Sequence, residues 1–324
     1  MTRVSVIIPL YNKRKTIRRA IDSILAQSER DLEVIVVDDG STDGSSHEVS
    51  ACVDSRVRLV CQENQGPGAA RNAGVRAAQA DTIAFLDADD EWSPRYLERS
   101  LGLLDQQNGS VLAVCSACMY LPDGTSSVEL WARRGLSDGV HGLTPDTSPG
   151  LAIALLAFMW PCSTVIRRGT LTRFGGFFSK YRCLYGEDSF LFLKLLLNGN
   201  MYVNLSPLAR YHREDSDLTH TWDKPREIEP ILTESQEIVE SCPPQLVPLL
   251  STLLKRRAAK TACVLAYWGR WREAHDLLDK FRNHEGSSAP YLLAYSVANP
   301  IGATAARGFR GARRWVKKSK YPAV

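Results

Sequence analysis

The chain has 324 residues, enough for one large domain or two ordinary domains that each bury a hydrophobic core. Its formal net charge is +4, from 40 basic and 36 acidic side chains, and this excludes the strong basic excess of a dedicated nucleic-acid-binding protein. Because no run of about 18 apolar residues occurs, the sequence does not predict a membrane-spanning helix.

Two further features bear on the compartment. The amino terminus runs directly into a short apolar strand rather than the apolar core of a signal peptide, so we expect a cytoplasmic protein. The 8 cysteines have no framework spacing and are predicted to be reduced core residues. Cys115 and Cys118 form a CxxC pair without a second pair of ligands, which favours a structural role over a zinc site.

Strands and helices alternate through the first hundred residues. Hydrophobic patterning predicts strands at 4–9, 32–37, 57–60 and 82–86, with helices at 16–27, 45–53 and 68–80 between them. This order predicts an α/β fold with a mainly parallel, Rossmann-like sheet and helices on both faces. The carboxyl ends of the strands then meet at one edge, where open α/β sheets bind ligands.

The rest of the chain is less regular. A helix opens near Pro94, strands are predicted at 111–120 and 160–167, and the polar stretch 122–149 is predicted to be a mobile loop. After residue 217 the pattern becomes helical, and a hairpin with Gly269 at its turn is predicted over 261–281. The predicted helical segments of this region are 227–239, 246–268 and 271–281.

An acidic cluster directly follows the apolar strand 82–86. Asp87, Asp89 and Asp90 crowd negative charge at the ligand-binding edge of the predicted sheet. Two carboxylates 4 Å apart repel by roughly 4 kcal/mol at an effective dielectric near 20, so a cation is expected between them. A divalent metal that carries a phosphate is the natural candidate.

Four blocks in sequence order, Val4–Asn12, Val36–Asp43, Asn64–Gly74 and Phe85–Asp90, together resemble family 2 glycosyltransferases. The resemblance implies a GT-A fold over residues 1–220, with a nucleotide-sugar half at about 1–110 and an acceptor half at about 111–220. Residues 221–324 would be a helical accessory region with a basic tail.

The resemblance assigns roles on the donor side. Tyr11 would pack on the nucleobase, Asp39 would accept a hydrogen bond from the imide N–H of uracil or thymine, and Arg71 would contact the base or diphosphate. Asp89, in the DxD motif, would hold Mn2+ or Mg2+. The implied nucleotide-binding residues are Pro9, Tyr11, Asp39, Arg71, Asp87 and Ala88.

On the acceptor side, Glu187 and Asp188 are similar to the family's Glu-Asp block. In an inverting transfer Asp188 would be the general base and Glu187 would help to place the acceptor. Acids in the first turn of a helix also complement its dipole, so this role stays open. Lys194 stands where the family often has Arg. His212 lies in a segment that resembles the late histidine segment of the family, which implies a role as a metal ligand. A histidine packed in the core is the alternative.

Plainer roles compete at other positions. Tyr11 is also compatible with the core, and Asp38 and Asp43 are compatible with turn caps. Trp131 and Trp160 either line the acceptor groove or lie in the core. A partial dinucleotide-binding match at residues 66–71 fails, because Arg71 replaces the third glycine and the motif follows the third strand.

These residues predict a metal-dependent inverting glycosyltransferase. The resemblance implies a nucleotide-sugar donor, expected to be a UDP-sugar. The implied acceptor is a hydroxyl of a glycan or lipid-linked oligosaccharide in polysaccharide biosynthesis. Rival hypotheses are a sugar nucleotidyltransferase, which would favour a glycine-rich loop after the first strand, and a non-catalytic nucleotide-sugar-binding scaffold.

Two interpretations of the basic tail stay open. It either lies on an anionic membrane surface at the inner face of the membrane, or it is the solvated end of a helix. The helical region would either form the contacts of a homo-oligomer or help to capture the acceptor. The basic residues around Trp315 are Arg307, Arg310, Arg313, Arg314, Lys317, Lys318 and Lys320.

Overall fold

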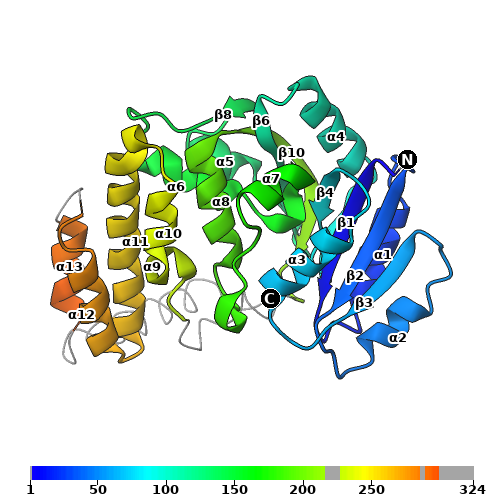
Figure 1. Ribbon diagram of the computed structural model, residues 1–324, viewed down its shortest axis with the longest axis horizontal. Helices are drawn as coiled ribbons and strands as arrows, with labels where there is room; N and C mark the ends of the chain where they lie inside the picture. The colour runs from blue at the N-terminus through cyan, green and yellow to red at the C-terminus, as the bar shows by residue number, and fades with distance from the viewer. Residues whose placement is uncertain (1, 216–226, 285–288, 299–324) are drawn as a thin grey trace.

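The first hundred residues form the predicted alternation of parallel strands and helices (Figure 1). The computed structural model describes residues 2–215, 227–284 and 289–298. The strands of this part are β1 (Val4–Leu10), β2 (Leu32–Asp38), β3 (Val57–Cys61) and β4 (Thr82–Phe85), and the helices are α1 (Ile17–Leu25), α2 (Ser45–Ser50) and α3 (Pro67–Ala77). β1 lies between β2 and β4 and runs parallel to both, so the predicted parallel sheet is confirmed here.

Helix α3 packs unusually close to the sheet. A Cβ atom added at Gly74 would lie 2.3 Å from Ile7 in β1, so only glycine allows this approach. The close packing brings Arg71, one turn earlier on α3, to the carboxyl end of the sheet. Ile7 itself is fully buried, with Ile35 and Phe85 as its neighbours in register on the flanking strands.

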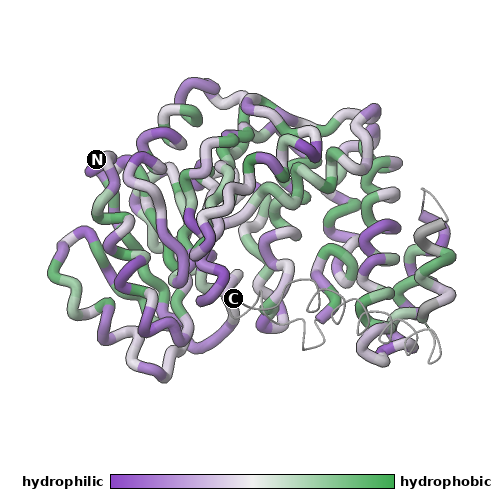
Figure 2. Tube along the Cα trace, turned by 180° about the vertical axis from the view of Figure 1, so that it is seen from behind, coloured by the Kyte–Doolittle hydropathy of each residue, from purple (hydrophilic) through white to green (hydrophobic). Residues whose placement is uncertain are grey.

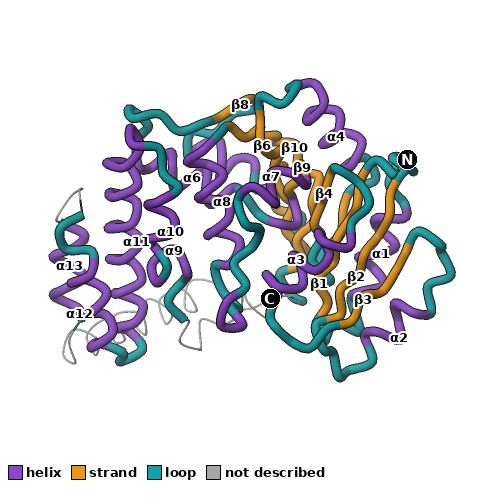
Figure 3. The backbone as a smooth tube through the Cα atoms, viewed as in Figure 1, coloured by secondary structure: helices purple, strands orange, loops and turns teal. Residues whose placement is uncertain are grey.

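The second half of the sheet is mixed. β9 (Thr164–Arg167) runs antiparallel between β4 and β6 (Val111–Leu121), and β10 (Asn200–His212) pairs parallel with β6. β5 (Glu91–Trp92) pairs antiparallel with β10 and gives the order β3-β2-β1-β4-β9-β6-β10-β5. The two longest ladders, β1 with β2 and β6 with β10, are parallel. Figure 3 shows the strands of the sheet with helices around them.

The stretch 122–149 is not simply a loop, as the sequence predicted. It contains β7 (Thr125–Ser126), α5 (Val128–Arg133) and β8 (Gly139–His141), which pair with or pack near β6 and β10. Trp131 anchors the segment, because its ring is 4% exposed and meets Phe158 edge to face with a centroid distance of 5.4 Å. The other helices of this half are α4 (Tyr96–Gln106), α6 (Pro149–Phe158), α7 (Arg168–Arg173) and α8 (Glu187–Asn198), with short 3-10 turns η1 (Pro161–Ser163) and η2 (Lys180–Arg182).

The C-terminal helices continue the core of the sheet domain. Leucines and alanines of α11 pack against α6, and Figure 2 shows hydrophobic residues along these helices as well as along the strands. The predicted hairpin is confirmed, since α11 packs on α12 beyond a turn with Gly269 at φ +81°. The helices are α9 (Pro230–Thr233), α10 (Ser235–Glu240), η4 (Pro244–Leu246), α11 (Val247–Tyr267), α12 (Trp271–Lys280) and α13 (Ala289–Val297).

One predicted helix and one predicted strand differ in the structure. The single helix predicted over 227–239 is instead divided into α9 and α10 at Glu234, and the strand predicted over 160–167 begins as the turn η1. The basic tail around Trp315 lies outside the described residues. Among the described helices, none combines the length and apolar character needed to cross a membrane.

All eight cysteines are free, but they are not all core residues. Cys61 is exposed, and Cys52 and Cys263 are partly exposed, so the core interpretation is wrong for these three. Cys115 and Cys118 are buried, and the Cys115 thiol lies 3.3 Å from the Thr164 hydroxyl. The expected structural role of the CxxC pair agrees with this burial.

Candidate functional site

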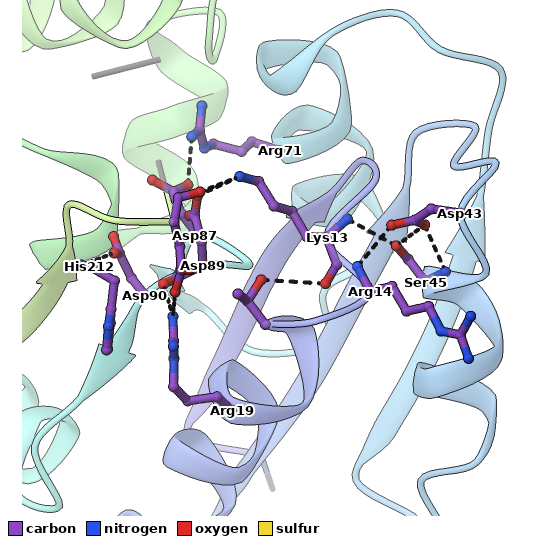
Figure 4. A network of polar contacts seen from close by, with 12 residues as sticks. Lys13, Arg14, Arg19, Asp43, Ser45, Arg71, Asp87, Asp89, Asp90 and His212 are labelled. Atoms are coloured by element: carbon purple, nitrogen blue, oxygen red, sulfur yellow. Dashed lines mark hydrogen bonds and ion pairs between the residues drawn. The ribbon is translucent and has the colours of Figure 1, made fainter. Parts of the chain in front are cut away.

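The acidic cluster follows β4 at the carboxyl edge of the sheet, as predicted. Figure 4 shows Asp87, Asp89 and Asp90 between Lys13, which lies in the loop after β1, and His212, the last residue of β10. The site therefore draws on both halves of the sheet. Its negative charges are met by basic side chains from α1, α3 and the β1–α1 loop.

Arg71 joins the two halves of the site. Its guanidinium lies 2.8 Å from an Asp87 oxygen and 2.7 Å from a Glu187 oxygen, and the side chain packs over the Phe177 ring at 5.2 Å. Arg71 is 5% exposed, and the two carboxylates raise its pKa against the effect of burial. The planar guanidinium suits this double pairing, because it offers donors in two directions. The residue thus orients Asp87 and Glu187.

Asp89 is also paired with a cation. The Lys13 ammonium lies 2.9 Å from Asp89 Oδ2 and donates a hydrogen bond of 2.8 Å to the carbonyl of Asp215. Arg19 donates to the carbonyl of Asp89 and, at 2.7 Å, to the Asp215 carboxylate. Burial and the charge of Asp87 raise the pKa of Asp89, and Lys13 opposes the rise.

Asp90 and His212 form the deepest part of the cluster. Asp90 is 2% exposed and accepts a 3.1 Å hydrogen bond from the His212 backbone N–H. Burial and the charges of Asp89 and Asp87 hold the pKa of Asp90 well above its usual range. Among the described residues, Asp90 Oδ2 and His212 Nε2 have no close hydrogen-bond partner, although the Cys162 thiol lies beside the Asp90 carboxylate and His212 Nε2 is 3.5 Å from Glu91. Unsatisfied buried polar atoms of this kind are costly unless a ligand completes them.

The residues present fit a divalent cation. Ligand atoms of His212, Glu214 and Asp215 lie within 4.8 Å of one another, and Arg19 ties Asp215 to the backbone of Asp89. Carboxylate oxygens suit Mg2+ and Mn2+, and an imidazole nitrogen is accepted more readily by Mn2+. The orphaned His212 Nε2 and Asp90 Oδ2 are consistent with such a group.

Asp188 lies in the first turn of α8, next to the residue that Arg71 binds. Burial, together with the charge of Glu187, raises the pKa of Asp188 to about 7, while Arg71 lowers it. One oxygen accepts a 2.6 Å hydrogen bond from the Ser189 N–H. A carboxylate with this pKa exchanges a proton near neutral pH, as a general base requires.

Asp39 organises the loop between β3 and α3. The carboxylate is 3% exposed and accepts 2.8 Å hydrogen bonds from the Gln62 side chain and from the N–H groups of Gln65 and Gly66. Gly66 has φ +91°, a conformation that favours glycine. Asp39 therefore holds this loop in place beside β1 and β2.

The other residues that were predicted to bind the nucleotide differ in their solvent exposure. The Tyr11 ring is 46% exposed, which excludes the core interpretation, and Pro9 is partly exposed. Ala88 is 3% exposed, so its methyl group packs in the core and only its backbone remains for a ligand.

The turn-cap and aromatic predictions can also be placed. Asp38 accepts from the Ser41 N–H and Asp43 from the Arg14 and Ser45 N–H groups, so both residues cap turns. Trp131 is buried in the core and does not line a groove. Trp160 is partly exposed, and its ring lies 5.4 Å from that of Tyr211 at the end of β10.

Sequence reasoning missed Lys13, Arg19 and Asp215 as members of the site. The crowded carboxylates did indicate that a cation was needed, and Lys13 directly follows the first motif block. The sequence did not show that Asp215 lies against helix α1, where Arg19 binds it. The structure brings these residues together across a separation of 202 positions.

Part of the chain is similar to a known protein family. Residues 5–148 match glycosyl transferase family 2. The chain is 44% identical over 124 residues to the succinoglycan biosynthesis protein ExoO of Rhizobium meliloti, an overlap of 38% of this chain and 35% of the relative. It is 42% identical over 122 residues to a Bacillus subtilis protein named "Putative glycosyltransferase EpsH", an overlap of 37% of this chain and 35% of the relative. The chain thus spans about a third of the length of these curated relatives.

Solved structures show the same fold over most of the chain. S. aureus TarS in complex with UDP-GlcNAc is similar with a TM-score of 0.57 at 17% identity, over 91% of this chain and 90% of that chain. The mannosyltransferase PcManGT of Pyrobaculum calidifontis, in complex with GDP-Man and Mn2+, gives 0.54 at 20% identity, over 94% and 86%. At these identities the likeness establishes the fold, and the predicted GT-A architecture is confirmed.

Proposed function

We propose that this protein transfers a sugar from a UDP-linked donor to a hydroxyl group of a glycan or lipid-linked oligosaccharide, with inversion at the anomeric carbon. The observation that carries the proposal is the Arg71 bridge, which holds the donor-side Asp87 and the acceptor-side Glu187 at opposite ends of one guanidinium. The name of one relative, the succinoglycan biosynthesis protein ExoO, favours a glycan acceptor.

The donor nucleotide would lie over the carboxyl ends of β1 and β2. The exposed Tyr11 ring offers a flat apolar face to the base, and Pro9 lies two residues earlier at the end of the same strand. Asp39 fixes the loop at 62–66 that would border the base. Asp87 would accept hydrogen bonds from the ribose, because Arg71 holds its carboxylate in a fixed orientation.

A divalent cation, when bound, would stabilise the negative charge that develops on the departing diphosphate. Asp89 and His212 would hold it. Possible ligand atoms of Glu214 and Asp215 lie close to His212, and Lys13 and Arg19 contact both Asp89 and Asp215. The protein's own contribution is to keep these acids close together at a partly buried edge, where Lys13, Arg19 and Arg71 offset their mutual repulsion.

Asp188 would take the acceptor proton. As the acceptor oxygen forms its bond to the anomeric carbon, the bond from that carbon to the diphosphate oxygen breaks on the opposite face, and Asp188 receives the hydroxyl proton. A pKa of about 7 leaves a large fraction of Asp188 ionised at neutral pH and still basic enough to accept a proton. Glu187 would act through Arg71, because its carboxylate is already bound there.

Calorimetry with UDP, GDP and TDP, each with Mn2+ or with EDTA, tests the donor assignment. We expect UDP to bind with Mn2+ and to lose most of its affinity with EDTA or in Asp89→Ala. Asp22→Ala is the matched control, because Asp22 is an exposed acid on α1 whose carboxylate pairs with Arg18 of the same helix. Failure of every diphosphate to bind would contradict the proposal.

A second assay separates catalysis from simple binding. Release of UDP from UDP-sugars should be measurable in the wild-type protein and should fall about 100-fold or more in Asp188→Asn, the usual scale for loss of a general base. UDP affinity should remain near the wild-type value in this variant. Equal turnover in both proteins would exclude Asp188 as the base, and donor binding without turnover in either would favour the scaffold alternative.

A further inference from the structure

Lys13 is a cation that the chain itself places on the proposed metal carboxylate. Its ammonium is 2.9 Å from Asp89 Oδ2 and 2.8 Å from the carbonyl oxygen of Asp215, and the Lys13 side chain is 17% exposed. Figure 4 shows the side chain reaching across from the β1–α1 loop to the acids that follow β4. The contact lies within the site but has no part in the roles that the sequence assigned.

Hydrogen bonds hold the backbone at Lys13 in place. The Lys13 backbone N–H donates a 3.0 Å hydrogen bond to Ser45, and the next residue, Arg14, donates its N–H to Asp43 at 3.0 Å. Asp43 lies in the turn before α2, and Ser45 is the first residue of α2. The ammonium is therefore presented to Asp89 from a loop that is tied to the second βα unit.

A divalent cation and this ammonium compete for the same oxygen. Metal–carboxylate distances are about 2.0–2.2 Å for Mg2+ and similar ions, so a metal on Asp89 Oδ2 would stand within a few ångströms of the Lys13 charge. Two cations at that separation repel, unless an anion lies between them. Lys13 must then leave Asp89 or find an anionic partner before a metal binds tightly.

We propose that Lys13 is an internal counter-ion that competes with the metal for Asp89 in the free protein and pairs with the donor diphosphate when the donor binds. The inference rests on the proposed function, because it takes the metal and the nucleotide diphosphate as ligands of this site. Lys13 thereby couples the two binding events: the metal binds weakly alone, and the diphosphate strengthens its binding by giving Lys13 a new partner.

The alternative is a purely structural tether between the β1–α1 loop and Asp215. A tether predicts that removal of Lys13 lowers stability and leaves Mn2+ affinity unchanged or weaker. An internal competitor predicts the opposite sign, because removal of the ammonium frees the carboxylate for Mn2+. The direction of the change therefore distinguishes the two roles.

Mn2+ binding to the full chain, measured by electron paramagnetic resonance of free Mn2+ with and without saturating UDP, tests the proposal. In Lys13→Met we expect Mn2+ to bind about 10-fold more tightly without UDP, the effect of one partly buried ion pair, and UDP to bind about 10-fold more weakly with Mn2+. Lys13→Arg keeps the charge and should stay within about 3-fold of wild type in the absence of UDP. Lys15→Met is the matched control, since Lys15 is exposed two residues away.

Unchanged or weaker Mn2+ binding by Lys13→Met without UDP would overturn the inference while leaving the proposed function intact, provided that the wild-type protein binds Mn2+ with UDP. Absence of Mn2+ and UDP binding in the wild-type protein would overturn both. If Lys13→Met does not fold, Lys13→Gln replaces it with the same expected direction.

Discussion

Removal of the Arg71 guanidinium should cost more stability than removal of any surface ion pair. Arg71→Met keeps an unbranched side chain of similar length but leaves Asp87 and Glu187 without their shared cation. At 2.7–2.8 Å and an effective dielectric near 20, each attraction is about 6 kcal/mol before desolvation is subtracted. Because Arg71 and Glu187 are buried, we expect a net loss of about 3–5 kcal/mol in the free energy of unfolding.

The assay is urea unfolding at pH 8, followed by fluorescence and circular dichroism. Arg14→Met is the control, because Arg14 pairs with Glu48 at 3.1 Å while both side chains are exposed, and such pairs contribute about 1 kcal/mol or less. Adding Glu187→Gln to Arg71→Met should recover part of the loss, since the amide carries no charge that needs a partner.

A loss in Arg71→Met no larger than that of Arg14→Met would refute this reasoning. The same variant offers a second measurement. Arg71 lowers the pKa of Asp188, so its removal should move the pH midpoint of transfer activity upward. A downward movement would mean that Arg71 does not act on Asp188 by its charge.

Other predictions concern pH, packing and thiol access. Transferase activity should rise with pH to a plateau with a midpoint near 7, because the base must be ionised, and Asp188→Asn should abolish the profile. The pKa of Asp188 in the fold lies above the unfolded value of about 3.9, so its contribution to stability decreases as pH rises from about 4 to 7, and urea midpoints of Asp188→Asn should lack this component. Trp131→Ala should lower the free energy of unfolding by about 3–5 kcal/mol in the same urea assay, and a loss below 1 kcal/mol would contradict its core role. In the native protein a thiol reagent should modify Cys61 fastest, which mass mapping against Cys61→Ser checks, whereas rapid labelling of Cys115 would contradict its burial.

Local patterning was sufficient for the first half of the fold. β1, β2 and β4 each carry a short apolar run that is buried on both faces and followed by turn residues, so they could be predicted without knowledge of their neighbours. β3 is only partly buried, and it was predicted from its shorter apolar run. The acidic cluster after β4 could be placed at the ligand edge for the same reason. The second half was harder to predict, because β9 and β5 run antiparallel and the segment at 122–149 gains order only through contacts such as that of Trp131.

The sequence by itself determined which chemical groups stand at the ends of the strands, and with them the resemblance to glycosyltransferase family 2 over residues 5–148. Tertiary structure decided which charges meet. Arg71 and Glu187 are 116 positions apart, and Arg19 and Asp215 are 196 apart, yet each pair lies within hydrogen-bond distance. Periodicity records the hydrophobic face of one element, whereas an ion pair depends on where two elements cross, and that crossing is set by packing of the whole core.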